Sequence, residues 1–163
     1  MKYVLIGCGR IAVNHIKAVI NNQLELAAVC DVKPEAMETL LAKYGLEKDP
    51  SIHRYTDYKE MVDAEQPQLA AIATESGLHA QIALYCIQHG VNVIIEKPMA
   101  MSMADAEEII RRSEEKGVKV QTAGGVYDLR ERLYELEEKL SGMDFFRTGK
   151  SGIVNFLRVR SIR

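Results

Sequence analysis

Short apolar runs alternate along the chain with longer stretches in which apolar residues recur at helical spacing. After the first run, apolar side chains at Ala12, Ile16, Val19 and Ile20 follow the period of a helix. Later segments repeat this alternation, with strand-like runs of four to eight residues. The pattern predicts strands over residues 3–6, 24–31, 68–74, 91–95 and 118–122, and helices over residues 10–21, 34–44, 57–66, 76–89 and 102–116.

Boundary residues agree with this pattern. Pro34 stands where a first helical turn tolerates proline, and Gly45 and Gly117 are typical helix stops. Asp57 with Glu60 resembles a capping box. Strands that alternate with helices of ten to fifteen residues indicate βαβ units, so we predict an α/β fold: a doubly wound parallel sheet of the Rossmann type, with helices on both faces.

The last forty residues break the alternation. Leucines at Leu129, Leu133, Leu136 and Leu140 predict a charged, amphipathic helix. The stretch GIVNFLRVRSIR (152–163) resembles the first strand of a further domain, and no neighbouring strand is evident for it. We therefore expect a domain over residues 1–123 and, over 124–163, a helix plus the first strand of an apparently missing α+β domain. An unpaired strand is a sticky edge, so it should pair with another copy, fold back on the sheet or be poorly ordered.

Composition and charge narrow the functional classes. The chain has 163 residues, of which 47% are hydrophobic and 27% charged, as in an ordinary globular domain. Its net charge of −2 predicts no nucleic-acid partner, and no apolar run is long enough to predict a membrane span. Three cysteines without a Cys-x-x-Cys pair suit a cytoplasmic location, and the four histidines show no spacing typical of a metal site.

The turn between the first strand and the first helix has the pattern G-x-G-x-x-A. Gly7 permits a tight turn, Gly9 leaves no Cβ to block a pyrophosphate, and the small Ala12 allows close packing of helix and strand. Arg10 and Ile11 lie at the helix N-terminus, whose free N–H groups attract phosphate. A strand before this pattern and a helix after it predict a dinucleotide site.

An acidic residue ends the second strand. Asp31 lies twenty-two residues after Gly9, where a carboxylate accepts both ribose hydroxyls of an adenosine and repels a 2′-phosphate. NAD is therefore the expected cofactor and NADP the less favoured one, although Lys33 leaves some tolerance for NADP. A purely structural interpretation has two glycines in a turn and an aspartate that caps a helix. It explains the glycines and Asp31 separately, but not the spacing between them. An S-adenosylmethionine enzyme is the main rival, and it gives no reason for the next motif.

Glu96, Lys97 and Pro98 stand where the strand at residues 91–95 ends. Parallel sheets bind ligands beyond the carboxyl ends of their strands, and Gly7, Asp31 and Thr74 fall at such ends too. Taking a hydride from an alcohol carbon also requires its hydroxyl proton to leave, so a base must lie nearby. Lys97 is the candidate, and Glu96 either orients Lys97 or binds the ribose. The alternative is a solvated lysine at a strand end.

The stretch IATESGLHAQIALYCIQHGVNVIIEKPMAMS, together with the glycine loop and Asp31, resembles the Gfo/Idh/MocA oxidoreductases over residues 1 to about 123. The resemblance implies hydride transfer between a nicotinamide and a sugar or cyclitol carbon, and the stretch is most similar to dehydrogenases of nucleotide-activated sugar acids. It places the Thr74–Ser76 turn and His79 along the cofactor, and Glu96-Lys97-Pro98 at the nicotinamide ribose and substrate. His15 is expected to be structural. The resulting cofactor-binding set is Gly7, Gly9, Arg10, Ile11, Asp31, Thr74, Ser76, His79, Glu96, Lys97 and Pro98, with Lys97 also catalytic.

Family members continue into a second domain that shapes the sugar pocket and the oligomer interface, whereas this sequence stops at Arg163. Three hypotheses follow. The chain is the cofactor-binding half of a sugar dehydrogenase, a non-catalytic dinucleotide-binding or regulatory module that dimerises through its C-terminal segment, or a small enzyme completed by its partner in a homo-oligomer.

Overall fold

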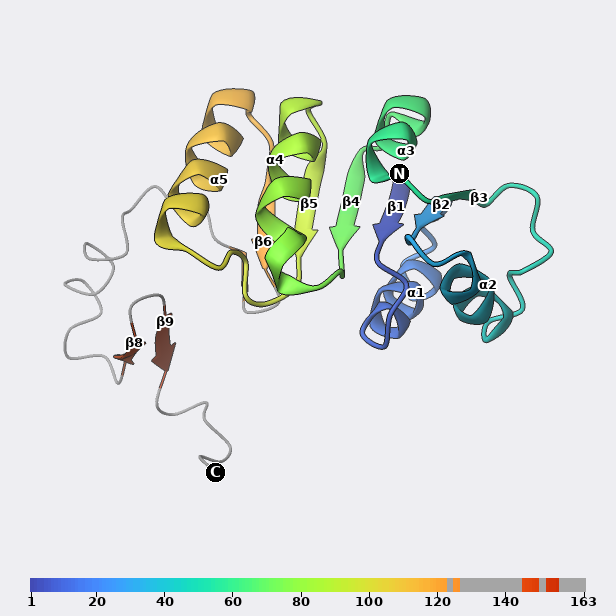
Figure 1. Ribbon diagram of the computed structural model, residues 1–163, viewed down its shortest axis with the longest axis horizontal. Coiled ribbons are helices and arrows are strands. Elements are labelled where there is room, and N and C mark those ends of the chain that lie inside the picture. The colour runs from blue at the N-terminus through green and yellow to red at the C-terminus, as the bar shows by residue number, and fades with distance from the viewer. Residues whose placement is uncertain (123–124, 127–144, 150–151, 156–163) are drawn as a thin grey trace. The chain divides into compact units, whose positions relative to one another are not determined.

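A sheet of seven strands, with the order β3-β2-β1-β4-β5-β6-β7, forms the centre of the fold (Figure 1). The computed structural model describes residues 1–122, 125–126, 145–149 and 152–155. Strands β1 to β6 run parallel, and β7 pairs antiparallel with β6. The strands are β1 (Lys2–Ile6), β2 (Glu25–Cys30), β3 (His53–Tyr55), β4 (Leu69–Ile72), β5 (Asn92–Ile95), β6 (Val120–Thr122) and β7 (Gly125–Val126).

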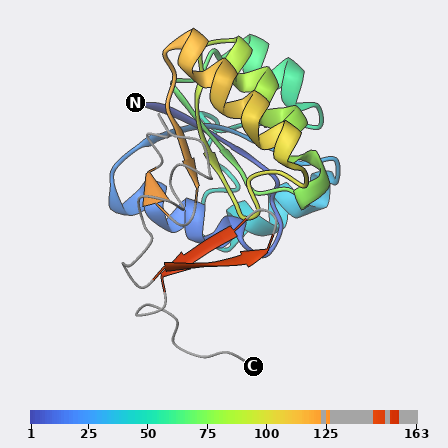
Figure 2. The same ribbon diagram turned by 90° about the vertical axis from the view of Figure 1, so that its left-hand side faces the viewer.

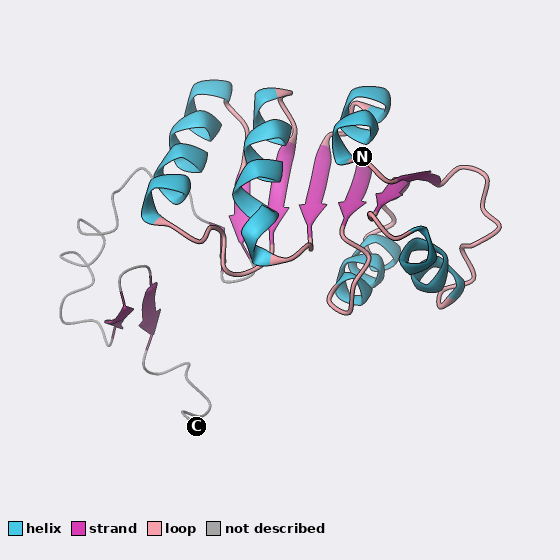
Figure 3. Ribbon diagram, in the orientation of Figure 1, coloured by secondary structure: helices cyan, strands magenta, loops and turns pink. Residues whose placement is uncertain are grey.

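Helices cover both faces of this sheet (Figures 2 and 3). On one face, α1 and α2 pack a core that includes Ile16 and Leu41. On the other, α3, α4 and α5 pack a second core that includes Met61, Ile82 and Ile109. The predicted doubly wound α/β fold is therefore confirmed. The helices are α1 (Ala12–Asn21), α2 (Pro34–Ala42), α3 (Tyr58–Glu65), α4 (His79–Gln88) and α5 (Met103–Lys116), with a 3₁₀ turn η1 (Ser76–Leu78) before α4.

Helix ends follow the local signals in the sequence. The Asp57 side chain caps α3 by accepting a hydrogen bond from the Lys59 N–H at 2.7 Å. Ser102 caps α5 in the same way through the Asp105 N–H. Gly117 ends α5 with a φ of +67°, a conformation that L side chains rarely adopt. No described helix combines the length and the apolar character that a membrane crossing needs.

The burial of both faces of the sheet explains why the strand segments of the sequence are continuously apolar and do not alternate with polar residues. Val4, Leu5 and Ile6 of β1 are all buried, because β1 lies inside the sheet and both of its faces are covered. Their side chains alternate between the two cores, with Val4 and Ile6 on the side of α3 and α4 and Leu5 on the side of α1 and α2.

The structure also contains strands that the sequence pattern did not indicate. Strand β3 has only three residues, and β7 has two, so neither produces a recognisable periodicity. The strand predicted near residue 152 does form, as β9 (Gly152–Asn155). The expectation that it lacks a neighbour in this chain is wrong, because it pairs antiparallel with β8 (Phe145–Gly149).

The chain folds into two compact units, Met1–Tyr127 and Asp128–Arg163. The hairpin of β8 and β9 belongs to the second unit. The predicted amphipathic helix with its four leucines lies outside the described residues.

A buried carboxylate ties three elements together at the amino-terminal edge of the sheet. Glu65, at the end of α3, has a side chain that is only 5% exposed. It binds Lys2 Nζ at 2.8 Å, His53 Nδ1 at 2.6 Å and the Tyr55 hydroxyl at 2.8 Å. Burial alone would raise the pKa of Glu65, but the hydrogen bonds from Lys2, His53 and Tyr55 outweigh it and lower the pKa to about 2.

Because the pKa of Glu65 is lowered in the folded state, its stabilising contribution is present above pH 4.5 and is lost as the pH falls toward 2. We expect Glu65→Gln to lower the free energy of unfolding at pH 7 by about 2 kcal/mol, a value discounted for the exposure of Lys2 and His53. Urea unfolding of both proteins between pH 7 and pH 3 measures this. A variant whose deficit stays constant over that range would contradict the assignment.

Candidate dinucleotide site

Four segments meet at the carboxyl edge of the sheet, where β1, β2, β4 and β5 end side by side. Backbone hydrogen bonds continue past the strand ends: Gly7 N–H donates to Cys30 O at 2.8 Å, and Ala73 N–H to Ile6 O at 2.7 Å. Glu96 N–H likewise donates to Ile72 O at 3.0 Å. The glycine loop, Asp31, the Thr74 turn and the Glu96-Lys97-Pro98 segment are therefore neighbours along one edge, as predicted from strand order.

Gly7 lies where the loop passes closest to the strand beside it. Its φ is +94°, and a Cβ at this position would stand 2.6 Å from the backbone carbonyl carbon and oxygen of Ala73. Only glycine satisfies both conditions, because other residues are strained at this φ and the obstacle is backbone that cannot move away. Gly7 therefore has a structural role that is independent of any ligand.

Gly9 has the opposite environment, since a Cβ there would meet nothing within 4 Å. The loop around it is open, and Arg10 and Ile11 are exposed. No side chain caps the N-terminus of α1, which leaves its positive dipole end available to an anion. An open glycine before an uncapped helix end fits the phosphates of a dinucleotide.

Asp31 is half-buried and linked to the glycine loop. Its Oδ2 accepts a hydrogen bond from the Cys8 N–H at 2.8 Å, and its Oδ1 accepts one from the Lys33 N–H at 2.9 Å. Each carboxylate oxygen has two acceptor positions, so one on each remains for a hydroxyl. Asp31 can therefore hold the loop and accept ribose hydroxyls at the same time.

The thiol inside the loop is buried. Cys8 is 6% exposed, and burial together with the charge of Asp31 raises its pKa to about 12. A thiol in that state is not a nucleophile at neutral pH. Cys8, Cys30 and Cys86 are all free and buried.

His79 joins the two segments that follow β4 and β5. It is 1% exposed, and its ring nitrogens lie 2.8 Å from Pro98 O and 3.0 Å from Thr74 O. Backbone carbonyls only accept, so a neutral imidazole donates to one of these two oxygens while packing against the other. The side chain thereby links the Thr74 turn to Pro98, and its predicted contact with a cofactor stays a prediction. Thr74 and Ser76 themselves are half-buried at this turn.

Glu96 and Lys97 differ sharply in their surroundings. Glu96 Oε1 lies 2.9 Å from Nε2 of His15, a residue of α1 that is 8% exposed. The other ring nitrogen of His15, Nδ1, lies 3.3 Å from the Tyr3 hydroxyl. Lys97 is exposed, and its peptide bond to Pro98 is cis. The Glu96 carboxylate is therefore held by His15, not by its neighbour Lys97.

Sequence reasoning missed the involvement of His15 and Tyr3. One signal was present, since His15 occupies the same helical face as the buried Ala12, Ile16 and Val19. A histidine on an apolar helix face needs a polar partner. The identity of that partner depends on how β1, β4 and β5 pair, and this pairing cannot be inferred from neighbouring residues in the sequence.

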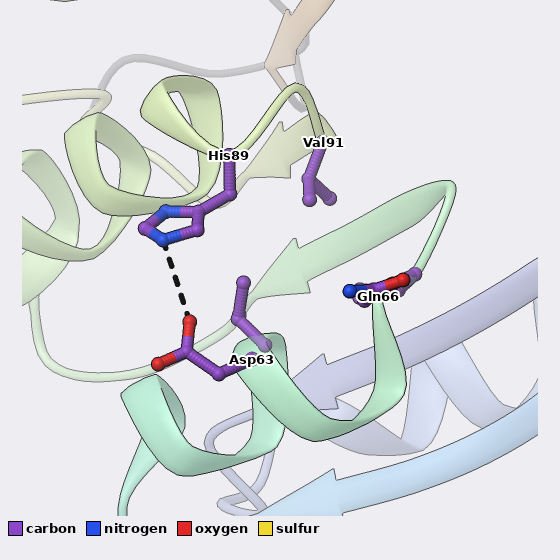
Figure 4. Close-up of a pocket in the computed structure, with 6 residues that line it drawn as sticks. Asp63, Gln66, His89 and Val91 are labelled. Atoms are coloured by element: carbon purple, nitrogen blue, oxygen red, sulfur yellow. Dashed lines mark ion pairs between the residues drawn. The ribbon is translucent and has the colours of Figure 1, made fainter.

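A shallow depression of ≈ 440 Å³ lies at the opposite edge of the sheet (Figure 4). Its lining comes from α3, the end of α4 and the residues just before β4 and β5, and His89 Nε2 and Asp63 Oδ1 approach there to 3.3 Å. None of the predicted site residues lines it, so we assign it no role in cofactor binding. Within the described residues, no group of three or more metal-ligating side chains occurs.

Comparison with known proteins identifies the class. The family model described as "Oxidoreductase family, NAD-binding Rossmann fold" (GFO_IDH_MocA) matches residues 1–123. The chain belongs to this family, and the resemblance drawn from its motifs is confirmed.

Similar proteins include several sugar-active dehydrogenases. D-apiose dehydrogenase of Paraburkholderia graminis is 33% identical over 72% of this chain and 30% of its own length. Inositol 2-dehydrogenase of Salmonella typhimurium is 27% identical over 76% of this chain and 36% of its own. The WlbA dehydrogenase of Bordetella pertussis, solved in complex with NADH and UDP-GlcNAcA, has a TM-score of 0.67 and 31% identity, covering 76% of this chain and 34% of that one. The chain thus spans about a third of the length of these relatives.

A second family model, "LytTr DNA-binding domain", matches residues 99–163. This match covers less than half of the chain and overlaps the first over residues 99–123. Most of its remaining residues lie outside the described ranges.

The two loop glycines give a matched test of the site. Gly7→Ala should lower the free energy of unfolding by about 3 kcal/mol or more, because its Cβ meets backbone at a positive φ. Gly9→Ala should fold with nearly wild-type stability but bind NADH at least about tenfold more weakly, because its Cβ enters the phosphate position. Thermal unfolding and fluorescence titration with NADH measure the two effects. A Gly9→Ala protein with wild-type NADH affinity would place the phosphates elsewhere.

Proposed function

We propose that this chain is the cofactor-binding part of an NAD-dependent oxidoreductase that acts on a hydroxyl of a sugar, cyclitol or nucleotide sugar. The observation that carries the proposal is the conjunction at one sheet edge of the open Gly9, the uncapped helix end and the Asp31 carboxylate. Family membership supports it, as do relatives named for sugar and cyclitol substrates.

The charge at Asp31 favours NAD over NADP. Its carboxylate is fixed by two backbone N–H groups, so it cannot turn away from an approaching 2′-phosphate without losing them. Like charges brought together in a partly buried site repel strongly. The Lys33 side chain, which is exposed, is the nearest residue in sequence that offers compensation.

The chemistry we propose places Lys97 at the reacting hydroxyl. A bound nicotinamide supplies the acceptor or donor of the hydride. In the oxidation direction, the unprotonated amine of Lys97 accepts the hydroxyl proton at Nζ; in the reduction direction, its ammonium returns that proton. The engagement of Glu96 by His15 supports this role, because the adjacent carboxylate is drawn away from Lys97.

Among possible substrates, we favour a nucleotide-activated sugar acid. The WlbA dehydrogenase, solved with UDP-GlcNAcA, supports this choice at 31% identity. We also propose a cytoplasmic protein that forms a homo-oligomer. The buried free cysteines support the first part, since a reducing compartment keeps thiols unpaired.

Asp31→Asn removes the charge but keeps an oxygen acceptor for the loop. We expect it to weaken NADH binding by about tenfold and NADPH binding clearly less, because the repulsion of the 2′-phosphate disappears together with the ribose contact. Lys97→Met is the control and should leave the ratio of the NADH and NADPH affinities within about twofold of wild type, because Lys97 is expected at the nicotinamide end and not at the adenosine ribose. Equal losses for both cofactors in Asp31→Asn would contradict the ribose role.

The same pair of variants separates binding from catalysis. With UDP-N-acetylglucosaminuronate as the substrate, Lys97→Met should lose about 10²-fold or more of any wild-type turnover, the usual contribution of a general base. Absorbance of NADH measures this. Wild-type turnover in Lys97→Met would remove Lys97 from the chemistry, and a wild-type chain that binds no NADH at millimolar concentration would contradict the proposed function itself.

A second candidate function concerns the C-terminal segment. Residues 145–163 contain five basic residues (Arg147, Lys150, Arg158, Arg160 and Arg163) and no acidic one, although the whole chain carries −2. This local excess and the partial match to a DNA-binding model favour contact with DNA phosphates. This second candidate is an alternative to the expectation of no nucleic-acid partner, which rested on the net charge of the whole chain and stays a prediction.

Replacement of Arg158, Arg160 and Arg163 by Gln should weaken binding to double-stranded DNA and reduce its dependence on salt, because about three phosphate contacts are removed. Replacement of Arg111 and Arg112 is the control, since both are already paired with Glu108 and Glu115 on α5. Fluorescence anisotropy between low and physiological salt reads both. If the wild-type chain does not bind DNA at low salt, this second function is excluded.

A further inference from the structure

Three polar side chains form a continuous hydrogen-bonded chain beneath the candidate site. The Tyr3 hydroxyl from β1, the imidazole of His15 from α1 and the Glu96 carboxylate after β5 are joined at 3.3 Å and 2.9 Å. Tyr3 is 2% exposed and His15 is 8% exposed, whereas the Glu96 side chain keeps 18%. The chain therefore begins in the core and ends at the site.

The chemistry of the partners assigns the direction of each bond. A carboxylate only accepts, so His15 donates to Glu96 through Nε2–H. In the neutral imidazole, Nδ1 is then the acceptor, and the Tyr3 hydroxyl donates to it. Burial and the charge of Glu96 raise the pKa of Tyr3, which keeps this hydroxyl protonated. Both ring nitrogens are thus satisfied in a single tautomer.

This arrangement is a support and not a route for protons. Tyr3 is enclosed in the core packed by α1 and α2, together with Leu5 and Ile16, so the inner end of the chain has no access to water. A proton taken up at Glu96 has nowhere to go beyond Tyr3. The remaining function of this series of hydrogen bonds is to fix the position of the Glu96 carboxylate.

The support also connects the two ends of the site. His15 lies in the first turn of α1, directly after the glycine loop, and Glu96 lies at the end of β5, with β1 and β4 between. On this face β4 and the residue after it contribute the small Ala71 and Ala73 to the core, and β5 contributes Ile94, two residues before Glu96. The imidazole therefore spans from the helix that faces the phosphates to the segment that carries Lys97.

We propose that His15 is a positioning residue of the dinucleotide site, which holds Glu96 so that its carboxylate receives a hydroxyl of the nicotinamide ribose; this rests on the proposed function. Oε1 is occupied by His15, while Oε2 has no hydrogen-bond partner among the described residues. A carboxylate anchored through one oxygen presents the other in a fixed direction, which lowers the ordering cost of binding. Tyr3 supports Glu96 indirectly, by fixing the tautomer of His15.

The test uses His15→Met, which removes both hydrogen bonds, and His15→Gln, whose amide can still donate to Glu96. We expect His15→Met to raise the Kd for NADH by about tenfold and His15→Gln to restore it to within about threefold, since one charge-assisted hydrogen bond is returned. Combining His15→Met with Glu96→Gln should cost no more than the larger single effect, because the two act through one contact.

A spectroscopic measurement on the full chain tests the same contact without activity. Nitrogen-15 NMR should show the Nε2–H tautomer of His15, and Glu96→Gln should shift its Nε2 resonance. If His15→Met does not fold, Glu96→Gln, at a partly exposed position, carries the affinity test and should raise the Kd by a similar factor.

The outcomes are distinguishable. A folded His15→Met that binds NADH as tightly as wild type, or Glu96→Gln with unchanged affinity, overturns the positioning role while the proposed function stands. The opposite tautomer of His15 overturns it too. A wild-type chain that binds no NADH overturns the proposed function, and this inference falls with it.

Discussion

The close approach of Gly7 to the backbone of Ala73 is the constraint on which the rest of the site depends. Only a residue without a Cβ lets the chain leave β1 this close to the end of β4, and at a positive φ. The turn then directs the chain into α1, which sets the direction of the helix dipole and the place of His15. The loop, Asp31 and the end of β5 come together because β1 lies between β2 and β4.

Several site residues serve the protein's own structure and leave capacity for a ligand. Asp31 accepts two backbone hydrogen bonds and retains acceptor positions. Glu96 is anchored through one oxygen, while the buried His79 lies between two backbone carbonyls and donates to one of them. The distinction separates residues that can contact a ligand from residues that shape the space around it, and it follows from counting donors and acceptors.

The sequence predicted the parts of the fold that depend on local signals. The glycine loop, the Asp57 cap and the order of the long elements each depend on a few adjacent residues. What failed was nonlocal or short: the three-residue β3, the pairing of β8 with β9, and the contact of His15 with a residue 81 positions away. Thr74, Ser76 and Lys97 lie at the predicted edge of the sheet, but their contacts with a ligand stay predictions.

The contacts of Glu65 with Lys2 and His53 lie where β1 and β3 begin, whereas Asp31 of the dinucleotide site follows the end of β2. The residues that stabilise the fold through Glu65 are therefore different from those that would have to change at the carboxyl edge to accept another ligand. Substitutions along the carboxyl edge can therefore accumulate without disturbing the contacts of Lys2 and His53 with Glu65. This separation lets one fold serve many different sites. The contacts that stabilise the fold stay unchanged while residues at the carboxyl edge are replaced.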